Sequence, residues 1–509
     1  MKKGLLIALA VAGLSTVAAR AQNAPPALDA AATALGTARL TSIEFSGWGS
    51  DYIFGQPYDA HSPWPRFGLP AITISIDYTT PAWRDDRRRT QVQNPPLGGG
   101  TQPLAGEQRQ IWLLSGSYAW DVVGQNAVPA APERDQRTAV NGRLAQIWLT
   151  PHGFIKAAIA NNATVTSETV RGAKKTWVAF TTPTKARFEG MLNDQHLVER
   201  IETWYDNPIL GDMMNEVVFK EYKDFGGVKF PTLLHSHQGD IRRNIGENSI
   251  EVRVSNVQAN VNVPVIAIPE AVRKATVPPV RVESQKVADG VWHIAGGTHH
   301  SLAVDFRDFV AVIEAPQNEE RSLAVIAEVE KLIPNKPIRY LVNTHHHFDH
   351  LGGLRTYATM GTTIVTHEGN REFYEDTVLS STPRTVQPDR FSSLFPYTRG
   401  GRRPEFETLN GKYVVSDGVR VLEIHHVEGL AHNANMLIAY LPKEKILVNA
   451  DLYSPPPQGA PAPAPNPNMM ALFRNIQRLK LDVAQHVPLH GRIATMDEFV
   501  KIVQTAKTQ

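Results

Sequence analysis

The chain contains no cysteine among its 509 residues. Disulfide bonds are therefore excluded, and any metal site must be built from histidine, aspartate and glutamate instead of thiolates. A surplus of one charge is also lacking, since 52 lysines and arginines face 50 aspartates and glutamates. So balanced a chain gives no reason to expect nucleic acid or an anionic membrane as a partner.

Long hydrophobic runs are absent after the N-terminus, so no transmembrane segment is expected in the mature protein. At the N-terminus two lysines precede an apolar run from Gly4 to Val17. Ala19 and Ala21 then supply small residues at the two positions that signal peptidase reads. This order predicts a cleaved signal peptide over residues 1–21. We therefore expect a periplasmic or secreted protein, as from a Gram-negative envelope. An uncleaved anchor helix is the alternative, and the shortness of the run disfavours it.

The length exceeds what one compact core accommodates, and 42% hydrophobic residues can fill more than one core. Val263 to Val282 carries four prolines and predicts a linker between two halves that differ in their hydrophobic periodicity. The predicted organisation is a signal peptide 1–21, a flexible leader 22–37, a β-rich domain 38–262, a Pro-rich linker 263–286 and an α/β domain 287–509.

The first half alternates apolar and polar residues with a period of two, which predicts a twisted antiparallel sheet, possibly a half-barrel. The expected strands are Gln110 to Trp120, Lys175 to Thr182, His196 to Tyr205, Asn215 to Tyr222 and Val228 to Leu234. The segment from Tyr222 to Pro231 resembles repeats of the periplasmic lipoprotein-carrier fold, a half-barrel that cradles acyl chains. That resemblance implies a lipid or apolar ligand. The alternative is a β domain that only packs against the second half.

The second half alternates strands with helices, which is typical of an α/β arrangement. The expected strands are Phe309 to Glu314, Ile338 to Asn343, Thr362 to Thr366, Val419 to His425, Ala434 to Tyr440 and Ile446 to Asn449. The expected helices are Glu319 to Leu332, Leu351 to Met360, Met469 to Leu479 and Met496 to Ala506. Tyr453 to Pro467 is Pro-rich, and we expect a surface loop there in preference to an active-site flap.

Histidines are concentrated in the second half, most densely between Asn343 and His350. This group follows a predicted buried strand and precedes a predicted helix, a place where α/β proteins put their sites. His345 and His347 are two apart, so an extended backbone directs both to one metal ion. Asp349 and His350 follow as the chain turns, toward a second position. Imidazole and carboxylate suit zinc, and less selectively iron or manganese.

The H-x-H-x-D-H pattern from His345 to His350 resembles the signature of the metallo-β-lactamase superfamily. Three later motifs agree with it in order: Gly429 to His432, Asn449 to Asp451 and Pro488 to Gly491. The resemblance implies an αββα sandwich, and hence an α+β protein, with two zinc ions per chain. By the same resemblance the first ion is held by His345, His347 and His432, the second by Asp349, His350 and His490, and Asp451 bridges the two.

Residues near these motifs have other expected roles. His299 or His300 could line the cleft, but a solvated surface position is favoured. His346 alternates away from the metal, so we expect it to pack or hydrogen-bond locally. His426 is the alternative to His432 as a metal ligand. Glu314 stands where the superfamily usually has a supporting Asp, which leaves its role open.

Two close cations lower the pKa of a bridging water, so that a hydroxide is available near neutral pH, and Asp349 is placed to orient it. We therefore expect hydrolysis of an acyl bond in a small molecule: a lactam, lactone, ester or thioester. A nuclease is disfavoured by the balanced charge. The alternatives are an iron-dependent oxidoreductase on the same ligands, and a lipid-binding envelope protein whose metal site is secondary.

Overall fold

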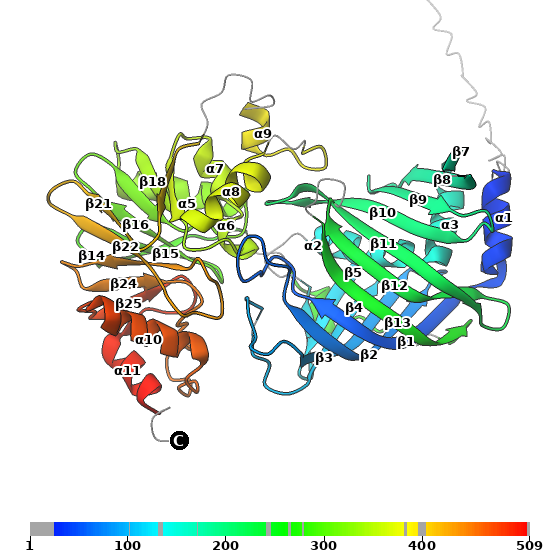
Figure 1. Ribbon diagram of the computed structural model, residues 1–509, viewed down its shortest axis with the longest axis horizontal. Helices are drawn as coiled ribbons and strands as arrows, with labels where there is room; N and C mark the ends of the chain where they lie inside the picture. The colour runs from blue at the N-terminus through cyan, green and yellow to red at the C-terminus, as the bar shows by residue number, and fades with distance from the viewer. Residues whose placement is uncertain are drawn as a thin grey trace, which may run out of the picture.

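The computed structural model describes residues 25–100, 102–130, 136–170, 172–240, 246–262, 266–276, 279–380, 384–394 and 404–505. The predicted signal peptide, residues 1–21, lies outside them. Figure 1 shows two parts: a large curved sheet, coloured blue to green, and a sandwich, coloured green to red. Within the described ranges, we find no helix with the length and apolar character needed to cross a membrane.

The N-terminal part is built on one antiparallel sheet of 13 strands, in the order β6-β5-β4-β3-β2-β1-β13-β12-β11-β10-β9-β8-β7. This confirms the predicted antiparallel β-rich domain. Its strands are β1 Ser42–Tyr52, β2 Arg66–Asp77, β3 Ala82–Gln91, β4 Gln108–Ser115, β5 Tyr118–Val123, β6 Asn126–Pro129, β7 Thr164–Val170, β8 Ala173–Thr181, β9 Arg187–Leu192, β10 Val198–Asn207, β11 Gly211–Asp224, β12 Lys229–Gly239 and β13 Glu247–Ala259.

Tight turns join several pairs of neighbouring strands in this sheet. Between β11 and β12, Asp224 Oδ1 accepts a hydrogen bond of 2.7 Å from the backbone N–H of Gly227, whose φ is 91°. The prediction of one strand from Gln110 to Trp120 is wrong, because Gly116 has a φ of 56° and turns the chain between β4 and β5. Apolar residues on both sides of that glycine make the hairpin look like one continuous strand.

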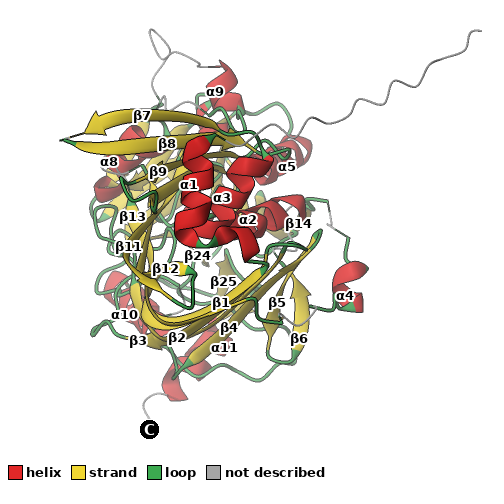
Figure 2. Cartoon of the chain, turned by 90° about the vertical axis from the view of Figure 1, so that its right-hand side faces the viewer, coloured by secondary structure: helices red, strands yellow, loops and turns green. Residues whose placement is uncertain are grey.

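Helices α1 Pro26–Leu35, α2 Gln136–Trp148 and α3 Pro151–Ala160 lie within the curve of the sheet (Figure 2). Leu28, Ala31 and Leu35 share one face of α1 and are fully buried in the core of this domain. The prediction of a flexible leader over 22–37 is therefore wrong for α1. Its Ala/Pro-rich composition suggested a loose chain, but a proline in the first turn and Gly36 at the C-cap instead delimit a docked helix.

The predicted linker 263–286 is shorter in the structure, and part of it is ordered against the sheet. Helix α4 Glu270–Arg273 places the buried side chain of Val272 beside Leu113 and Trp120. Strand β14 already begins at Glu283, so the second part starts before residue 287.

The C-terminal part contains two sheets. The first has seven strands: β14 Glu283–Ala288, β15 Val291–Ala295, β16 Ser301–Asp305, β17 Val310–Ile313, β18 Ile338–Val342, β19 Thr363–His367 and β20 Phe406–Leu409. The second has six: β21 Lys412–Ser416, β22 Val421–His426, β23 Leu437–Leu441, β24 Ile446–Asn449, β25 Gln485–Pro488 and β26 Ala494–Thr495. The helices are α5 Glu319–Leu332, α6 Phe348–Leu351, α7 Leu354–Ala358, α8 Arg371–Phe373, α9 Arg390–Leu394, α10 Pro467–Leu479 and α11 Met496–Gln504.

The two sheets pack face to face, with helices on both outer faces. Apolar residues of both sheets, such as Val342 and Val448, form the central core. Helices α5 and α7 cover the outer face of the first sheet, where Val325 and Leu354 are buried. Helices α10 and α11 cover the second sheet, where Leu472 is buried. This layering is the predicted αββα sandwich, and helix α5 begins and ends at the predicted residues.

Candidate metal centre

The histidine-rich segment forms a loop at the carboxyl end of β18. Strand β18 ends at Val342 and α6 begins at Phe348, so residues 343–347 connect a parallel strand to a helix. The side chains of His345, His347 and His350 are fully buried. The ring centroids of His345 and His347 lie 4.5 Å apart, and those of His345 and His350 lie 4.3 Å apart. The alternating positions thus bring these rings together.

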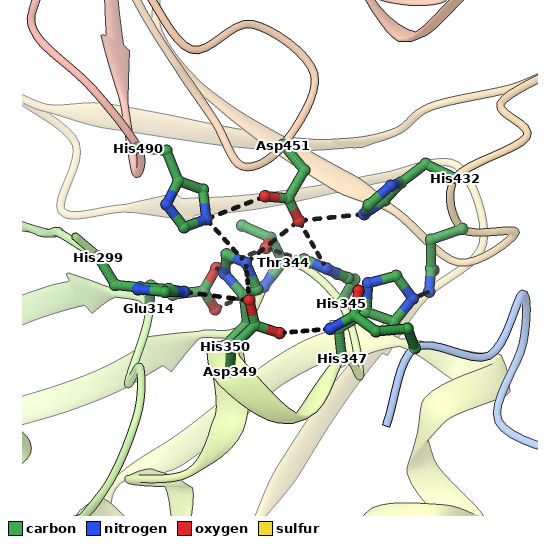
Figure 3. Close-up of polar contacts among 12 residues, drawn as sticks. His299, Glu314, Thr344, His345, His347, Asp349, His350, His432, Asp451 and His490 are labelled. Atoms are coloured by element: carbon green, nitrogen blue, oxygen red, sulfur yellow. Dashed lines mark hydrogen bonds and ion pairs between the residues drawn. The ribbon is translucent and has the colours of Figure 1, made fainter. Parts of the chain in front are cut away.

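The later motifs reach the same place from loops of the second sheet. Oδ2 of Asp451, which follows β24, lies 3.1 Å from Nε2 of His432 and 3.1 Å from Nε2 of His350. Its Oδ1 lies 2.9 Å from Nε2 of His490, which follows β25. Oδ2 also lies 3.1 Å from Nε2 of His345. Figure 3 shows the carboxylate of Asp451 between these rings, the central position of the cluster.

The donor atoms fall into two principal groups. In one, atoms of His345, His347, His432 and Asp451 all lie within 4.8 Å of one another. In the other, the same holds for His299, Asp349, His350 and His490. The structure therefore brings together every residue that the sequence proposed as a metal ligand: His345, His347, Asp349, His350, His432, Asp451 and His490. Asp451 contacts members of both groups, as a bridging residue requires.

His299 is a member of the second group, although the sequence favoured a solvated surface position for it. Its Nε2 lies 3.0 Å from Oδ2 of Asp349, and its ring centroid lies 4.3 Å from that of His490. The residue sits in the loop between β15 and β16. No spacing to the other motifs marks it. The only signal is its place in a loop between two strands.

Glu314 is fully buried and supports the cluster through hydrogen bonds. Its Oε2 accepts hydrogen bonds from Thr344 Oγ1 at 2.6 Å and from His350 Nδ1 at 3.2 Å. Its Oε1 accepts bonds from the side chain of Asn343 at 2.5 Å and the backbone of Thr344 at 3.2 Å. Glu314 thus fills the supporting role that the sequence left open, and it fixes both the histidine loop and the ring of His350.

Hydrogen bonds on the outer nitrogen of each ring decide which nitrogen faces the cluster. His350 donates its Nδ1–H to Glu314, and His490 donates its Nδ1–H to the carbonyl oxygen of Thr298 at 2.9 Å. His347 is turned the other way, and its Nε2 donates to a backbone carbonyl at 2.9 Å. Its buried Nδ1 has no hydrogen-bond partner among the residues that the structure describes. In the neutral form of each of these three rings, the nitrogen without a proton therefore faces the cluster, and imidazole nitrogens beside carboxylates suit divalent cations.

Burial and neighbouring charges set the protonation of these groups. Burial lowers the pKa of His345 to about 3 and that of His347 well below its usual value, and neighbouring histidines add to the effect. Burial would raise the pKa values of Asp349 and Asp451, but His350 and hydrogen bonds from other rings hold both low. His350 differs, because these carboxylates outweigh burial and raise its pKa well above the usual value. Anionic carboxylates and neutral imidazoles are the forms that bind metal.

His346 and His426 belong to neither of the two groups of donor atoms. His346 is buried and lies 3.2 Å from the amide of Asn433, so it hydrogen-bonds locally as predicted. His426 donates to the carbonyl oxygen of Ala434 at 2.8 Å and packs on His367, so it is not placed as the alternative ligand.

The Pro-rich segment begins beside the loop of His490. Arg492 donates a hydrogen bond of 2.8 Å to the carbonyl oxygen of Pro456 and so holds the start of this segment there.

Residues 295–486 match the sequence-family model described as the metallo-beta-lactamase superfamily. The C-terminal region has the metallo-β-lactamase fold. This confirms the resemblance carried by the histidine motifs. The match begins after the N-terminal sheet, so the resemblance of that sheet to the lipoprotein-carrier fold stays a prediction. No curated protein matches the chain.

Solved metallo-β-lactamase structures resemble part of the chain. One from Pontibacter korlensis is 22% identical and covers 45% of this chain and 100% of its own, with a TM-score of 0.33. The metallo-β-lactamase FIM-1 from Pseudomonas aeruginosa, in a mono-zinc form, is 21% identical. It covers 45% of this chain and 97% of its own, also with a TM-score of 0.33. One from Hirschia baltica is 19% identical, with 44% and 96% covered and a TM-score of 0.32.

Proposed function

We propose that this protein is an exported metallohydrolase that holds two zinc ions and hydrolyses an acyl bond of a small molecule. The observation that carries the proposal is the position of Asp451. Its two carboxylate oxygens lie between the ring nitrogens of His345 and His432 on one side and those of His350 and His490 on the other.

Each proposed metal position has a complete set of donors. His345, His347 and His432 would hold the first ion, and Asp349, His350 and His490 would hold the second. Asp451 would be shared between them. Two bound divalent cations lower the pKa of a shared water toward neutrality and stabilise the negative charge that develops on the substrate oxygen.

Asp349 is the residue of the chain that we assign to catalysis. Its side chain is 40% exposed, whereas that of Asp451 is 17% exposed, so Asp349 faces the solvent-accessible side of the cluster. His299 holds one of its oxygens at 3.0 Å. A carboxylate fixed in this way orients an attacking water or hydroxide. No serine or cysteine nucleophile is needed.

Zinc is proposed because the donor set combines imidazole with carboxylate and lacks thiolates. Iron would bind the same donors and support an oxidoreductase, so metal analysis of protein purified without added metal decides between the two. Export rests on the sequence of residues 1–21 and is tested by the N-terminal mass of the mature protein. An intact N-terminus would contradict a cleaved signal.

A hydrolysis screen of the zinc-loaded protein over lactam, lactone, ester and thioester substrates tests the activity. The negative variant is His345→Ala with His347→Ala, which should bind less zinc and lose hydrolysis. A matched control is His235→Ala with His237→Ala. These two histidines are also two positions apart in sequence and their ring centroids lie 4.5 Å apart, but they are on β12, away from the cluster. Equal activity of both double variants would exclude a metal-dependent hydrolase at this site.

A further inference from the structure

The loop that follows β1 in the N-terminal domain reaches the metal cluster of the C-terminal domain. Nε2 of Gln56 donates a hydrogen bond of 2.8 Å to Oδ1 of Asp349. The carbonyl oxygen of the next residue, Pro57, accepts a hydrogen bond of 2.9 Å from Nε2 of His347. Two consecutive residues of one domain thus contact two proposed metal ligands of the other.

We propose that this loop, residues 53–58, is a part of the metal centre, with Gln56 and Pro57 as positioning residues. The inference rests on the proposed function, because it assumes that the cluster holds metal ions. It assigns to the N-terminal domain a role that packing alone would not require. The C-terminal domain supplies the ligands, and the N-terminal domain fixes the orientation of one ligand at each metal position.

Pro57 determines which nitrogen of His347 is available. A backbone carbonyl only accepts hydrogen bonds, so the proton of the His347 ring must reside on Nε2. The free electron pair is then on Nδ1, which is buried and which no atom of the described part of the chain hydrogen-bonds. His350 and His490 have the opposite arrangement, with Nδ1 donating within the C-terminal domain. The first metal position therefore depends on a carbonyl group of the N-terminal domain.

Gln56 holds the carboxylate of Asp349 together with His299. Gln56 contacts Oδ1 and His299 contacts Oδ2, so each oxygen of Asp349 has its own partner. One partner comes from each domain. A carboxylate held at both oxygens cannot rotate freely, and such outer hydrogen bonds orient ligating carboxylates in metal sites. Gln56 thereby sets the direction in which Asp349 presents its oxygens to the second metal position.

The loop is anchored at its base by buried charges. The side chain of Asp51, near the end of β1, lies 3.0 Å from Nη1 of Arg87 and 3.4 Å from Nη1 of Arg89. All three side chains are buried. The backbone N–H of Ile53 donates to the carbonyl oxygen of Pro65 at 2.9 Å. A loop fixed in this way holds Gln56 and Pro57 at defined positions.

The same loop is tied to the segments that carry the ligands. The backbone N–H of Phe348, beside His347, donates to the carbonyl oxygen of Gly55 at 3.1 Å. The backbone N–H of Ala434 donates to the carbonyl oxygen of Tyr58 at 2.8 Å. The ring of Phe54 packs edge-on against Phe348, with centroids 5.3 Å apart. The blue segment beside His347 in Figure 3 belongs to this N-terminal part of the chain.

A second N-terminal segment closes the arrangement at Gly99. A β-carbon added there would lie 2.0 Å from Oε1 of Gln56 and 2.8 Å from Cε1 of His347. One methyl group at this position would therefore displace both the positioning amide and a proposed ligand. The backbone of the neighbouring Gly98 donates to the carbonyl oxygen of Ala431, beside His432, at 2.9 Å. The side chains of Gln56 and His347 lie so close to Gly99 that a side chain fits there only if they move.

The test uses the full chain with Gln56→Ala and Gly99→Ala. The matched controls are Gln195→Ala, at an exposed position between β9 and β10, and Gly142→Ala, where an added β-carbon meets nothing within 4 Å. Zinc affinity is measured by competition with a chelator, and the Co²⁺-substituted proteins are compared by their visible absorption. Far-ultraviolet circular dichroism and thermal unfolding of each protein monitor folding.

We expect Gln56→Ala to weaken zinc binding by about tenfold, the effect typical of losing an outer hydrogen bond to a metal ligand. Gly99→Ala should weaken it further and change the Co²⁺ spectrum, because His347 moves. Both controls should match the parent protein. If Gln56→Ala folds and both zinc affinity and the Co²⁺ spectrum are unchanged, the inference is wrong while the proposed function stands. If the parent protein binds no metal, both are wrong.

Discussion

Glu314 Oε2 accepts a hydrogen bond from Nδ1 of His350 at 3.2 Å, with both side chains fully buried. The carboxylate requires a proton on Nδ1, and Nε2 is then left to face Asp451 at 3.1 Å. Such a carboxylate behind a metal-binding histidine raises its basicity and fixes its ring. Glu314 therefore controls the second metal position without being close enough to the solvent to take part in the reaction.

Glu314→Gln should weaken zinc binding at the second position by about 10- to 100-fold. The amide can present an N–H to Nδ1, which would move the ring proton to Nε2 and block that nitrogen. Titration with zinc against a chelator measures the effect as the loss of the weaker of two binding steps. Glu330→Gln, at an exposed position on α5, is the control. Unchanged binding in Glu314→Gln would remove the supporting role assigned to this carboxylate.

The sequence was sufficient to predict that the seven proposed ligands lie together, and insufficient for what surrounds them. His345, His347 and Asp349 lie within one short segment, so local spacing alone relates their side chains. Glu314, His299 and Gln56 reach the cluster only through tertiary structure, because Gln56 and Asp349 are 293 positions apart. Hydrogen bonds across such separations leave no periodic trace in a single sequence. The layers of the sandwich were predictable because each element has its own hydrophobic period.

The errors in the N-terminal half have a common physical origin. The faces of an alanine-rich helix such as α1 differ little in hydrophobicity, and its docking depends on the concave sheet against which it packs. Likewise, Gly116 interrupts a run that is apolar on both sides, so alternation alone does not reveal the hairpin. Local patterns predicted a sheet, but not where it folds back or what it encloses.

His299→Ala should leave two zinc ions bound and lower the rate of hydrolysis by about 10- to 100-fold. The second position keeps Asp349, His350 and His490, whereas Oδ2 of Asp349 loses its partner at 3.0 Å. Outer hydrogen bonds of this kind affect activity on that scale. Zinc content and kcat are measured on the same preparation, with the substrate found in the screen. Loss of one zinc ion would instead identify His299 as a metal ligand.

Because His152 is buried, we expect the stability of the N-terminal domain to depend on pH. It is fully buried, its ring stacks on Phe230 with centroids 5.9 Å apart, and its Nε2 lies 3.1 Å from the carbonyl oxygen of Leu35. Burial lowers its pKa to about 4 from 6.5. The unfolded chain therefore binds a proton that the folded chain does not, and stability falls as the pH drops from about 6.5 to about 4.

This difference in pKa corresponds to at most about 3.5 kcal/mol at the acidic end, since one pKa unit is worth about 1.4 kcal/mol. Urea unfolding at several pH values in this window measures the slope for the parent protein and for His152→Gln. The variant is expected to be less stable at neutral pH but to lose less stability on acidification. Parallel slopes would show that His152 does not titrate differently in the folded and unfolded chain.

Leu35→Ala should destabilise the N-terminal domain by about 2–5 kcal/mol, the usual cost of deleting a buried leucine side chain. Leu35 is fully buried in the core that α1 shares with α3 and the sheet, so the change leaves a cavity there. Thr33→Ala, at an exposed position of the same helix, controls for any change in helix propensity. Denaturant unfolding followed by tryptophan fluorescence measures the difference. A flexible leader would tolerate both substitutions equally, because a chain segment outside the core loses no packing when a side chain is shortened. A large difference between the two variants is expected only if α1 is part of the folded core.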